Sequence, residues 1–161
     1  DTLSLHDALP IFLTFFMITA SFGAEKNRVP RFVSLRPNEV NARVGPGPHY
    51  PIEWVYLKAG LPVEVIAEFD TWRKIRDCEG AEGWVHQSMV CSKRHAIVQG
   101  DDILIYKTED KKSPPLARLQ RGVIVNLLKC RDDWCQVRIS GFKGWIQRHL
   151  LWGVYSQETV E

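Results

Sequence analysis

Apolar and polar residues alternate along several short segments of the chain. Between Pro62 and Phe69 the sequence PVEVIAEF places an apolar side chain at every second position, with two glutamates among the positions between. Strict alternation of this kind predicts a half-buried β-strand whose apolar residues share one face. Short polar turns, Asp70-Thr71 and Arg131-Asp132-Asp133, separate such segments. Beyond residue 23 no segment shows a convincing helical period, so the pattern predicts short strands joined by turns.

The segment from Lys58 to Val90 recurs, with changes, from Gln120 to Leu151. The earlier part of the two copies aligns at an offset of 62. After a one-residue deletion in the second copy, Gly83-Trp84-Val85 aligns with Gly144-Trp145-Ile146 at an offset of 61. Two copies are too few for a solenoid, which usually needs roughly three repeats or more. The repeat therefore predicts two tandem small domains. The earlier positions that agree, all at an offset of 62, are Gly60 with Gly122, Val63 with Val125, Trp72 with Trp134, and Ile75 with Val137.

Each copy has one tryptophan before and one after a predicted hairpin turn. Because a small barrel has few core positions, we expect large aromatic side chains to supply much of its buried area. This packing role is expected above all for Trp84 and Trp145. Trp72 and Trp134 begin a strand beside a polar loop, where a core position and a partly exposed binding platform are both consistent with the pattern.

The first copy also carries a set of spaced residues that is typical of one family. An N-x-R-x-G-P motif is followed by Y-P, K-x-G, a W-x-K-I strand and a closing G-W-V. Together these motifs resemble a bacterial SH3-like domain, and the resemblance extends over roughly Arg31 to Gly153. The residues that carry it are Asn41, Arg43, Gly45, Pro46, Tyr50, Pro51, Lys58, Gly60, Trp72, Lys74, Ile75, Gly83 and Trp84.

The resemblance implies an all-β fold. We expect two tandem small SH3-like β-barrels after an N-terminal signal peptide, the first barrel at residues 31–90 and the second at 92–153. Residues 154–161 would form a C-terminal tail.

The resemblance also implies a function, because such domains serve as binding modules in the bacterial envelope, often for peptidoglycan or for other proteins. We expect an exported, non-enzymatic protein that recognises cell-wall glycan or peptide in a shallow groove, without a cofactor. The candidate ligand-binding residues are Arg43, Tyr50, Trp72 and Trp134. Two alternatives are a peptide- or protein-binding assembly factor of the periplasm and, with less support, the targeting part of a cell-wall hydrolase.

The first copy is the expected recognition copy. The second has ILIYKTEDKKSPPLARL where the first has its Arg-x-Gly-Pro loop. A Gly-Pro loop is preshaped, because proline fixes φ and glycine permits close backbone approach. Two roles are open for Arg43. Its planar guanidinium can bind a carboxylate of the ligand, or its sole role is to donate hydrogen bonds to carbonyl groups of its own loop.

An apolar run near the N-terminus predicts export. Ile11 to Phe22 reads IFLTFFMITASF, shorter than the roughly 20 apolar residues of a spanning helix. It fits the hydrophobic region of a signal peptide at residues 12–23, with Ser21 and Gly23 as the small residues for cleavage before Ala24. We expect a periplasmic or secreted protein whose mature form has no transmembrane segment. A buried N-terminal strand or helix is the alternative.

Residues 1–11 do not fit a signal peptide. The stretch TLSLHDALPI has no Lys or Arg, whereas the start of a signal peptide is basic. It resembles the translation of a common sequencing adapter. We therefore expect these residues to be an artefact, and we assign no role to His6 or Asp7.

Four cysteines in an exported chain suggest disulfides. Cys130 and Cys135 bracket the turn RDDW on neighbouring predicted strands, where Cα atoms fall within the range of about 4.4–6.8 Å that a disulfide needs. Cys78 and Cys91 are the remaining pair, although no local pattern places them opposite each other. With His86 they lack the close spacing of a structural zinc site, so we expect no metal. None of the four lies in a recognisable peptidase motif.

Charge is distributed unevenly between the copies. Charged residues make up 25% of the chain and apolar residues 45%, a balance that argues against disorder. Residues 31–90 contain 7 Lys/Arg and 8 Asp/Glu, a net charge of −1, whereas residues 92–153 contain 12 and 6, a net charge of +6. The basic copy has either a solubilising surface or a contact with anionic lipid head groups or wall polymers. Nucleic acid is not expected as a partner of an exported protein. The histidines at positions 49, 86, 95 and 149 are scattered and most simply solvated.

Overall fold

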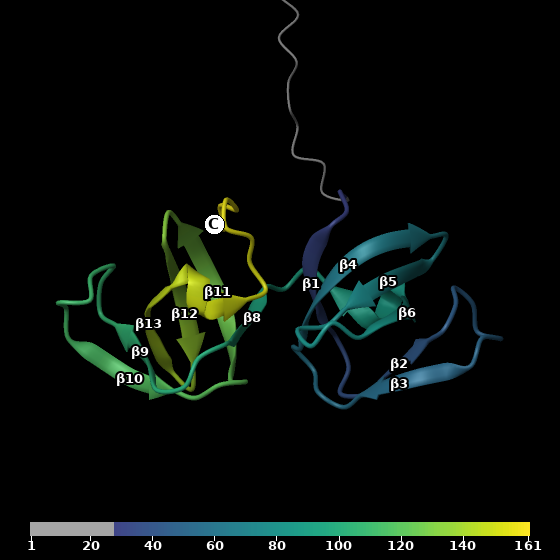
Figure 1. Cartoon of the computed structure of the whole chain (residues 1–161), viewed down its shortest axis with the longest axis horizontal. Coiled ribbons are helices and arrows are strands. Elements are labelled where there is room, and N and C mark those ends of the chain that lie inside the picture. Colours follow the sequence, from purple (N-terminus) through teal and green to yellow (C-terminus); the bar gives the residue numbers. More distant parts are fainter. Residues whose placement is uncertain (1–27) are drawn as a thin grey trace, which may run out of the picture.

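The computed structural model describes residues 28–161 as two β-barrels joined by a short linker (Figure 1). The expected adapter-like segment, signal peptide and cleavage site lie outside the described residues. Within residues 28–161 no helix is long and apolar enough to cross a membrane.

The first barrel is a seven-stranded sheet in the order β3-β2-β6-β5-β4-β1-β7, with every neighbouring pair antiparallel. A single turn of 3₁₀ helix, η1 (Gln87–Met89), connects its last two strands. The strands are β1 (Arg31–Leu35), β2 (Val40–Arg43), β3 (Ile52–Tyr56), β4 (Pro62–Phe69), β5 (Trp72–Arg76), β6 (Glu82–His86) and β7 (Val90–Cys91).

The second barrel repeats this topology in the order β10-β9-β13-β12-β11-β8-β14. Both barrels have an irregularity at equivalent places, where the register shifts between Val65 and Ala67 in β4 and between Leu127 and Lys129 in β11. The tandem all-β prediction is confirmed. The elements of this barrel are β8 (His95–Val98), β9 (Ile103–Tyr106), β10 (Pro115–Leu119), β11 (Ile124–Arg131), β12 (Trp134–Ile139), β13 (Phe142–Gln147), η2 (Arg148–Leu150) and β14 (Leu151–Trp152).

Each barrel has its own core, and both cores are aliphatic. The first contains Val63, Val65 and Ile75, and the second contains the equivalent Val125, Leu127 and Val137. None of the six tryptophans, all of which lie in the described residues, is fully buried. The expectation that large aromatic side chains fill the barrels is therefore wrong.

The alternation along β6 explains where Trp84 lies instead. Gly83 and Val85 are buried and face the barrel interior, so the side chain between them must face outward. Gly144 and Ile146 place Trp145 on the outside of β13 in the same way.

The predicted alternation of β4 holds only as far as its irregularity. Val63 and Val65 are fully buried, but Phe69 beyond the register shift is 61% exposed. Such an irregularity inserts a residue into one strand and re-aims the side chains that follow. The polar face is also not wholly solvated, because Glu64 is only 8% exposed.

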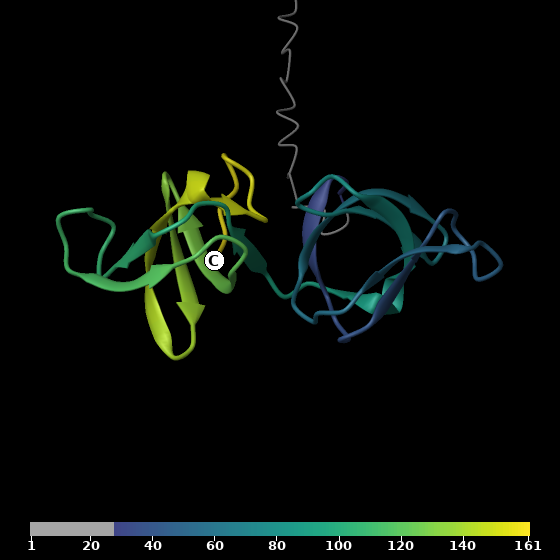
Figure 2. The ribbon, with the colours of Figure 1, turned by 60° about the horizontal axis from the view of Figure 1, so that its bottom comes forward.

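Glu64 is buried because the C-terminal segment of the second barrel covers it. Tyr155 Oη donates a hydrogen bond of 2.7 Å to one carboxylate oxygen of Glu64, and Arg76 Nη2 donates one of 2.6 Å to the other. Phe32 of β1 packs edge-on against Trp152, at 5.0 Å between ring centroids, and in a tilted arrangement against Tyr155, at 4.6 Å. Figure 2 shows the two barrels side by side with the linker between them.

The tail, residues 154–161, folds back on the second barrel. Val160 forms a β-bridge with Cys130, and Arg94 pairs with Glu158. The buried guanidinium of Arg148 donates to the carbonyl oxygens of Tyr155 and Glu158 at 2.7 and 2.5 Å. These contacts hold Tyr155 in position for the junction with the first barrel.

The predicted disulfide between Cys130 and Cys135 is present, and the two residues are direct cross-strand partners on β11 and β12. The predicted second disulfide is wrong: Cys78 and Cys91 are both free. Cys78 lies in the β5–β6 turn, whereas Cys91 pairs with Ser34 beyond η1. The length of the β5–β6 hairpin therefore separates them.

Candidate functional site

The outer face of β5 and β6 carries a row of aromatic and charged side chains. Trp72 is the cross-strand partner of His86, and Lys74 is the partner of Trp84. Direct partners in an antiparallel pair point to the same face, so these four residues share one surface. β2 extends the row, because Arg43 is the partner of Trp84 on its other side.

A shallow groove of about 340 Å³ lies along this face, and we call it the Trp72 groove. The Trp72 ring stands edge-on to the His86 ring at 5.7 Å between centroids. His86 Nδ1 accepts a hydrogen bond from the backbone N–H of Ser88 at 3.3 Å, which leaves Nε2 to carry the ring proton as a donor. The residues that line the groove are Glu39, Asn41, Arg43, Trp72, His86 and Met89.

Arg43 braces its own loop and also faces the groove. Its Nη1 donates a hydrogen bond of 2.7 Å to the carbonyl oxygen of Tyr50, which ties the start of the loop to its end. One guanidinium nitrogen is thus engaged by the backbone, and Arg43 still lines the Trp72 groove. A guanidinium offers five N–H donors in a fixed fork, so a loop brace and a ligand contact are compatible.

Tyr50 does not join the groove. Its ring packs against Gly45 and Gly47 within the loop and stacks on His49 at 4.3 Å between centroids. The structure therefore brings Arg43 and Trp72 together but places Tyr50 on the loop itself.

A second groove of about 390 Å³ lies on the other side of Arg43, and we call it the Trp54 groove. Trp54 of β3 is half exposed there, and Trp84 of β6 also lines the groove. Lys74 and Glu82 form an ion pair of 2.8 Å within it. The hydrogen bond from Lys74 holds the pKa of the Glu82 carboxyl below its ordinary value, so this carboxylate stays ionised.

The second barrel has a less charged version of the same row. Tyr106 is the partner of Trp145, the position that Arg43 holds beside Trp84. The Trp134 ring stands edge-on to Tyr106 at 6.0 Å, and Gln147 takes the place of His86 beside Trp134. Trp134 therefore lies far from the Trp72 groove, on the other barrel.

The loop between β9 and β10 folds over this second row. Glu109 of the loop pairs with Arg131 at 2.7 Å, and the Arg131 guanidinium lies 6.0 Å from the centre of the Trp145 ring. Trp145 is thus partly covered by its own barrel, whereas the first barrel has an open groove at the corresponding place.

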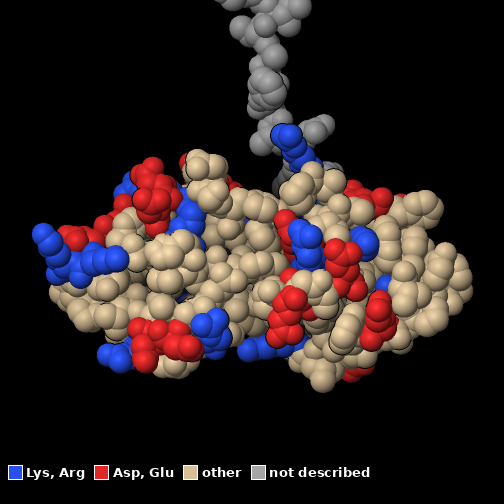
Figure 3. Space-filling view, in the orientation of Figure 1, with Lys and Arg blue, Asp and Glu red and all other residues tan. Residues whose placement is uncertain are grey.

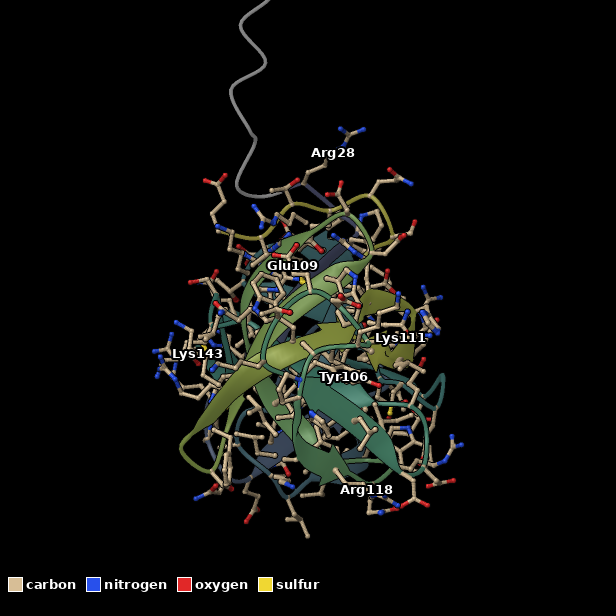
Figure 4. The ribbon with its side chains drawn as sticks, turned by 90° about the vertical axis from the view of Figure 1, so that its left-hand side faces the viewer. Arg28, Tyr106, Glu109, Lys111, Arg118 and Lys143 are labelled. Atoms are coloured by element: carbon tan, nitrogen blue, oxygen red, sulfur yellow. A yellow bond between two sulfur atoms is a disulfide. The ribbon has the colours of Figure 1, made fainter. Side chains whose placement is uncertain are left out.

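The basic residues of the second barrel are spread around it. Figure 4 shows Lys111 and Lys143 pointing outward on opposite sides of Tyr106, with Arg118 below and Glu109 above. In Figure 3, acidic and basic side chains are mixed over the visible face of both barrels. The net charge of +6 therefore does not form a single uninterrupted basic face on that side.

Two residues of the candidate site were not assigned to it from the sequence. No sequence motif marks Trp54, and the small size of the barrel favours a core position for Trp84. The pattern Gly83-Trp84-Val85 contains the signal for Trp84, because a tryptophan between two small or apolar residues of a strand must face away from them. No comparable signal exists for Trp54, whose exposure depends on how β3 lies in the barrel. In residues 28–161 no three His, Cys, Asp or Glu side chains gather as a metal site.

Comparison with known proteins identifies a family for both barrels. The model of a family described as bacterial SH3 domain matches residues 36–91 and again residues 99–153. No curated protein matches the chain.

Among solved structures, the chain is similar to NlpC2 from Trichomonas vaginalis, with a TM-score of 0.37 and 13% identity over 78% of this chain and 49% of that one. For NlpC1 from Trichomonas vaginalis the values are 0.37 and 13%, over 80% of this chain and 47% of that one. The chain thus spans about half the length of each of these proteins. Likeness at this level indicates neither a shared activity nor a shared ligand.

Proposed function

Because the chain belongs to the bacterial SH3 domain family, we propose that it is an exported, non-enzymatic binding module that recognises cell-wall material in the bacterial envelope. The Trp72 groove of the first barrel is the proposed recognition site. The domain family supports a binding role, and the geometry of this groove supports the choice of barrel.

The observation that carries the proposal is that Arg43 and Trp72, from two strands distant in sequence, face one open groove. The Trp72 ring offers a flat apolar surface, and the Arg43 fork can hold a carboxylate in two parallel hydrogen bonds. Asn41 and His86 add hydrogen-bonding groups to the same walls. A glycan or peptide with a free carboxylate has the matching chemistry.

Pre-organisation supports the first barrel as the recognition barrel. The bond from Arg43 to the Tyr50 carbonyl and the packing of the Tyr50 ring on Gly45 hold the loop in one shape before any ligand arrives. A site that is already ordered loses less conformational entropy on binding.

The second barrel would contribute an auxiliary contact with anionic polymer or lipid. Its net charge of +6 favours association with such surfaces, and the effect should weaken as salt is raised. Because the basic residues surround the barrel, we propose a steering role for them and not a second specific site.

The absence of catalysis is part of the proposal, and two Ser–His contacts bear on it. Ser34 Oγ lies 2.8 Å from His95 Nδ1, but this serine is fully buried and donates its proton to the Lys93 carbonyl. Ser88 Oγ lies 2.7 Å from His86 Nδ1, a nitrogen that already accepts the backbone N–H of Ser88. The Ser34 pair is closed to a substrate, and we propose that the exposed Ser88 pair serves as the cap of η1 and not as a nucleophile and its base.

Co-sedimentation of the chain with purified cell-wall sacculi tests the proposal, with capture from envelope lysate run in parallel. We expect the wild-type chain to pellet with the sacculi, and Trp72→Ala to weaken binding by roughly 1–3 kcal/mol. Trp134→Ala is the matched control, since it removes the equivalent ring from the other barrel and should matter less.

Two results would overturn the assignment. Loss of binding through Trp134→Ala with Trp72→Ala unchanged would move the site to the second barrel. Failure of the folded chain to bind sacculi, together with Trp72-dependent capture of an envelope protein, would favour a periplasmic assembly factor.

A further inference from the structure

One segment of the first barrel exposes far more apolar surface than the rest of the described chain. Of ten large apolar side chains that are exposed in residues 28–161, six lie between positions 44 and 57. Contiguous exposed apolar surface on a soluble protein usually marks a contact with another molecule. The six are Val44, Tyr50, Ile52, Trp54, Val55 and Leu57.

Three of the six lie on β3 and a fourth, Leu57, directly follows it; β3 is an edge strand with a free row of backbone groups. Its exposed side chains range from 47% for Ile52 to 74% for Leu57 just beyond its end. Neighbouring strands in a sheet satisfy each other's N–H and C=O groups, so an edge of this kind can pair with another strand.

The other three sheet edges of the described chain are protected. β7 and β14 are only two residues long. β10 is similar in length to β3, but Pro114 and Pro115 stand at its start and Arg118 lies on it. Short edges, prolines and charged residues are the devices by which proteins prevent edge pairing. β3 is the long edge that these devices leave open.

We propose that β3 pairs with β3 of a second copy of this chain in antiparallel orientation, forming a two-fold dimer centred on Val55. Two-fold pairing of identical strands makes one sheet continuous across both copies. The exposed segment Ile52 to Lys58 reads IEWVYLK, and Val55 is its middle residue.

Charge complementarity favours a second copy in this orientation. The segment carries Glu53 near its start and Lys58 at its end, so antiparallel pairing brings the acidic end of one strand near the basic end of the other. Glu53 then stands opposite Leu57 of the partner subunit, and the attraction acts between the strand ends and not through a direct ion pair, because Glu53 and Lys58 point to opposite faces. Parallel pairing in register would set Glu53 beside Glu53, and like charges opposite each other are destabilising.

The register centred on Val55 also matches apolar side chains. Antiparallel partners share a face, so Trp54 lies opposite Tyr56 of the partner subunit, and Val55 lies opposite itself. Cross-strand pairs of aromatic and of β-branched residues are the stabilising kind.

The edge is accessible in the two-barrel protein. β3 runs along the lower border of the first barrel in Figure 1, and the β2–β3 loop points away from the second barrel in Figures 1 and 2. A dimer of this kind would present two Trp72 grooves to a repeating polymer and so strengthen binding through multivalency.

Sedimentation of the full chain over a range of concentrations tests the proposal. We expect a reversible monomer–dimer equilibrium that Val55→Lys weakens about tenfold or more, because it sets two lysines directly opposite each other. Phe142→Lys is the matched control, since Phe142 is similarly exposed, at 52%, but lies on the second barrel. It should leave the dimer unchanged. The thermal melting of both variants confirms that they remain folded.

Cysteine cross-linking checks the register in a chain that also carries Cys78→Ser and Cys91→Ser. Val55→Cys should form a disulfide-linked dimer under mild oxidation, because the residue opposes itself. Leu57→Cys, although more exposed, should cross-link much more slowly. A chain that stays monomeric, a dimer that survives Val55→Lys, or equal cross-linking at positions 55 and 57 would each overturn the proposal.

Discussion

Gly45 has no room for a side chain, because a Cβ built there would lie 2.5 Å from Cδ1 of the Tyr50 ring. The ring in turn closes the loop whose ends Arg43 ties together. The loop beside the Trp72 groove thus depends on a glycine, an aromatic ring and one guanidinium in contact.

Gly45→Ala should destabilise the chain by roughly 1–3 kcal/mol, the usual cost of overpacking a filled site, and should displace Tyr50. Urea unfolding provides the measurement. In a chain that already carries Tyr50→Ala, the same substitution should cost much less, because the ring it meets is gone. An equal cost in both backgrounds would show that the Tyr50 ring is not what excludes a side chain at position 45.

At the scale of elements, the two barrels close the same hairpin by different chemistry. Cys130 and Cys135 are cross-strand partners on β11–β12, and the equivalent positions on β4–β5 are Glu68 and Arg73, also cross-strand partners. Arg73 Nε lies 3.0 Å from the Glu68 carboxylate. A covalent bond in one copy therefore corresponds to a solvent-accessible ion pair in the other.

The two closures should differ in their contribution to stability. Replacing both Cys130 and Cys135 by alanine should lower the free energy of unfolding by about 2 kcal/mol, because a short closed loop is lost from the unfolded chain. Glu68→Gln, which also removes the 2.6 Å ion pair with Arg31, should cost about 1 kcal/mol or less, because both pairs remain in contact with water. Urea midpoints with and without reductant measure both effects.

The free cysteines supply the control for the disulfide. A chain with Cys78→Ala and Cys91→Ala should remain as sensitive to reductant as the wild type. If the chain with Cys78→Ala and Cys91→Ala were no longer sensitive to reductant, the stabilising disulfide would not be Cys130–Cys135. Sensitivity that persisted after Cys130 and Cys135 were replaced would contradict this pairing in the same way.

At the scale of the whole molecule, the tail of the second barrel joins the two barrels. Glu64 of the first barrel accepts from Tyr155 and Arg76, and burial together with the bond to Glu64 raises the pKa of the Tyr155 hydroxyl, so it remains a donor. Burial acts to raise the pKa of Glu158, but hydrogen bonds from Arg94 and from the Tyr155 N–H outweigh it and hold this pKa below its ordinary value. The junction thus combines aromatic packing with one buried, hydrogen-bonded carboxylate.

Tyr155→Phe should destabilise the chain by about 1–3 kcal/mol, because it leaves a buried carboxylate oxygen without its donor. Small-angle scattering should also show a broader range of separations between the barrels. In a chain that carries Glu64→Ala, Tyr155→Phe should have little further effect on the urea midpoint. Full additivity of the two substitutions would mean that the hydrogen bond does not couple the barrels.

Acid should weaken the same junction through His95, which faces Ser34, Asn126 and Lys93. Burial, and then the charge of Lys93, lower its pKa from the ordinary 6.5. The folded chain therefore takes up this proton less readily than the unfolded chain, and stability falls as the pH drops below about 6.5 toward the lowered folded value. Urea midpoints measured across this range should fall in the wild type and change less in His95→Gln. Equal slopes would show that another group dominates.

Much of the architecture follows from the sequence alone, because the information is local. Alternation over a few residues and turns such as Asp70-Thr71 determine strands and hairpins, and the repeat predicts two domains. The pairing of Cys130 with Cys135 was predictable for the same reason, since a two-residue turn sets which residues stand opposite each other.

Contacts between distant segments were decided only by the tertiary structure. A period of two says which side chains share a face, but which face is inside depends on how the sheet closes, and this is why Trp84 was wrongly assigned to the core. The Trp72 groove forms because β2 returns beside β6 and brings Arg43 to Trp72. The burial of Glu64 under Tyr155 and the open edge at β3 likewise depend on which strand becomes a neighbour of which, and no local pattern encodes that because it is set by the packing of the whole chain.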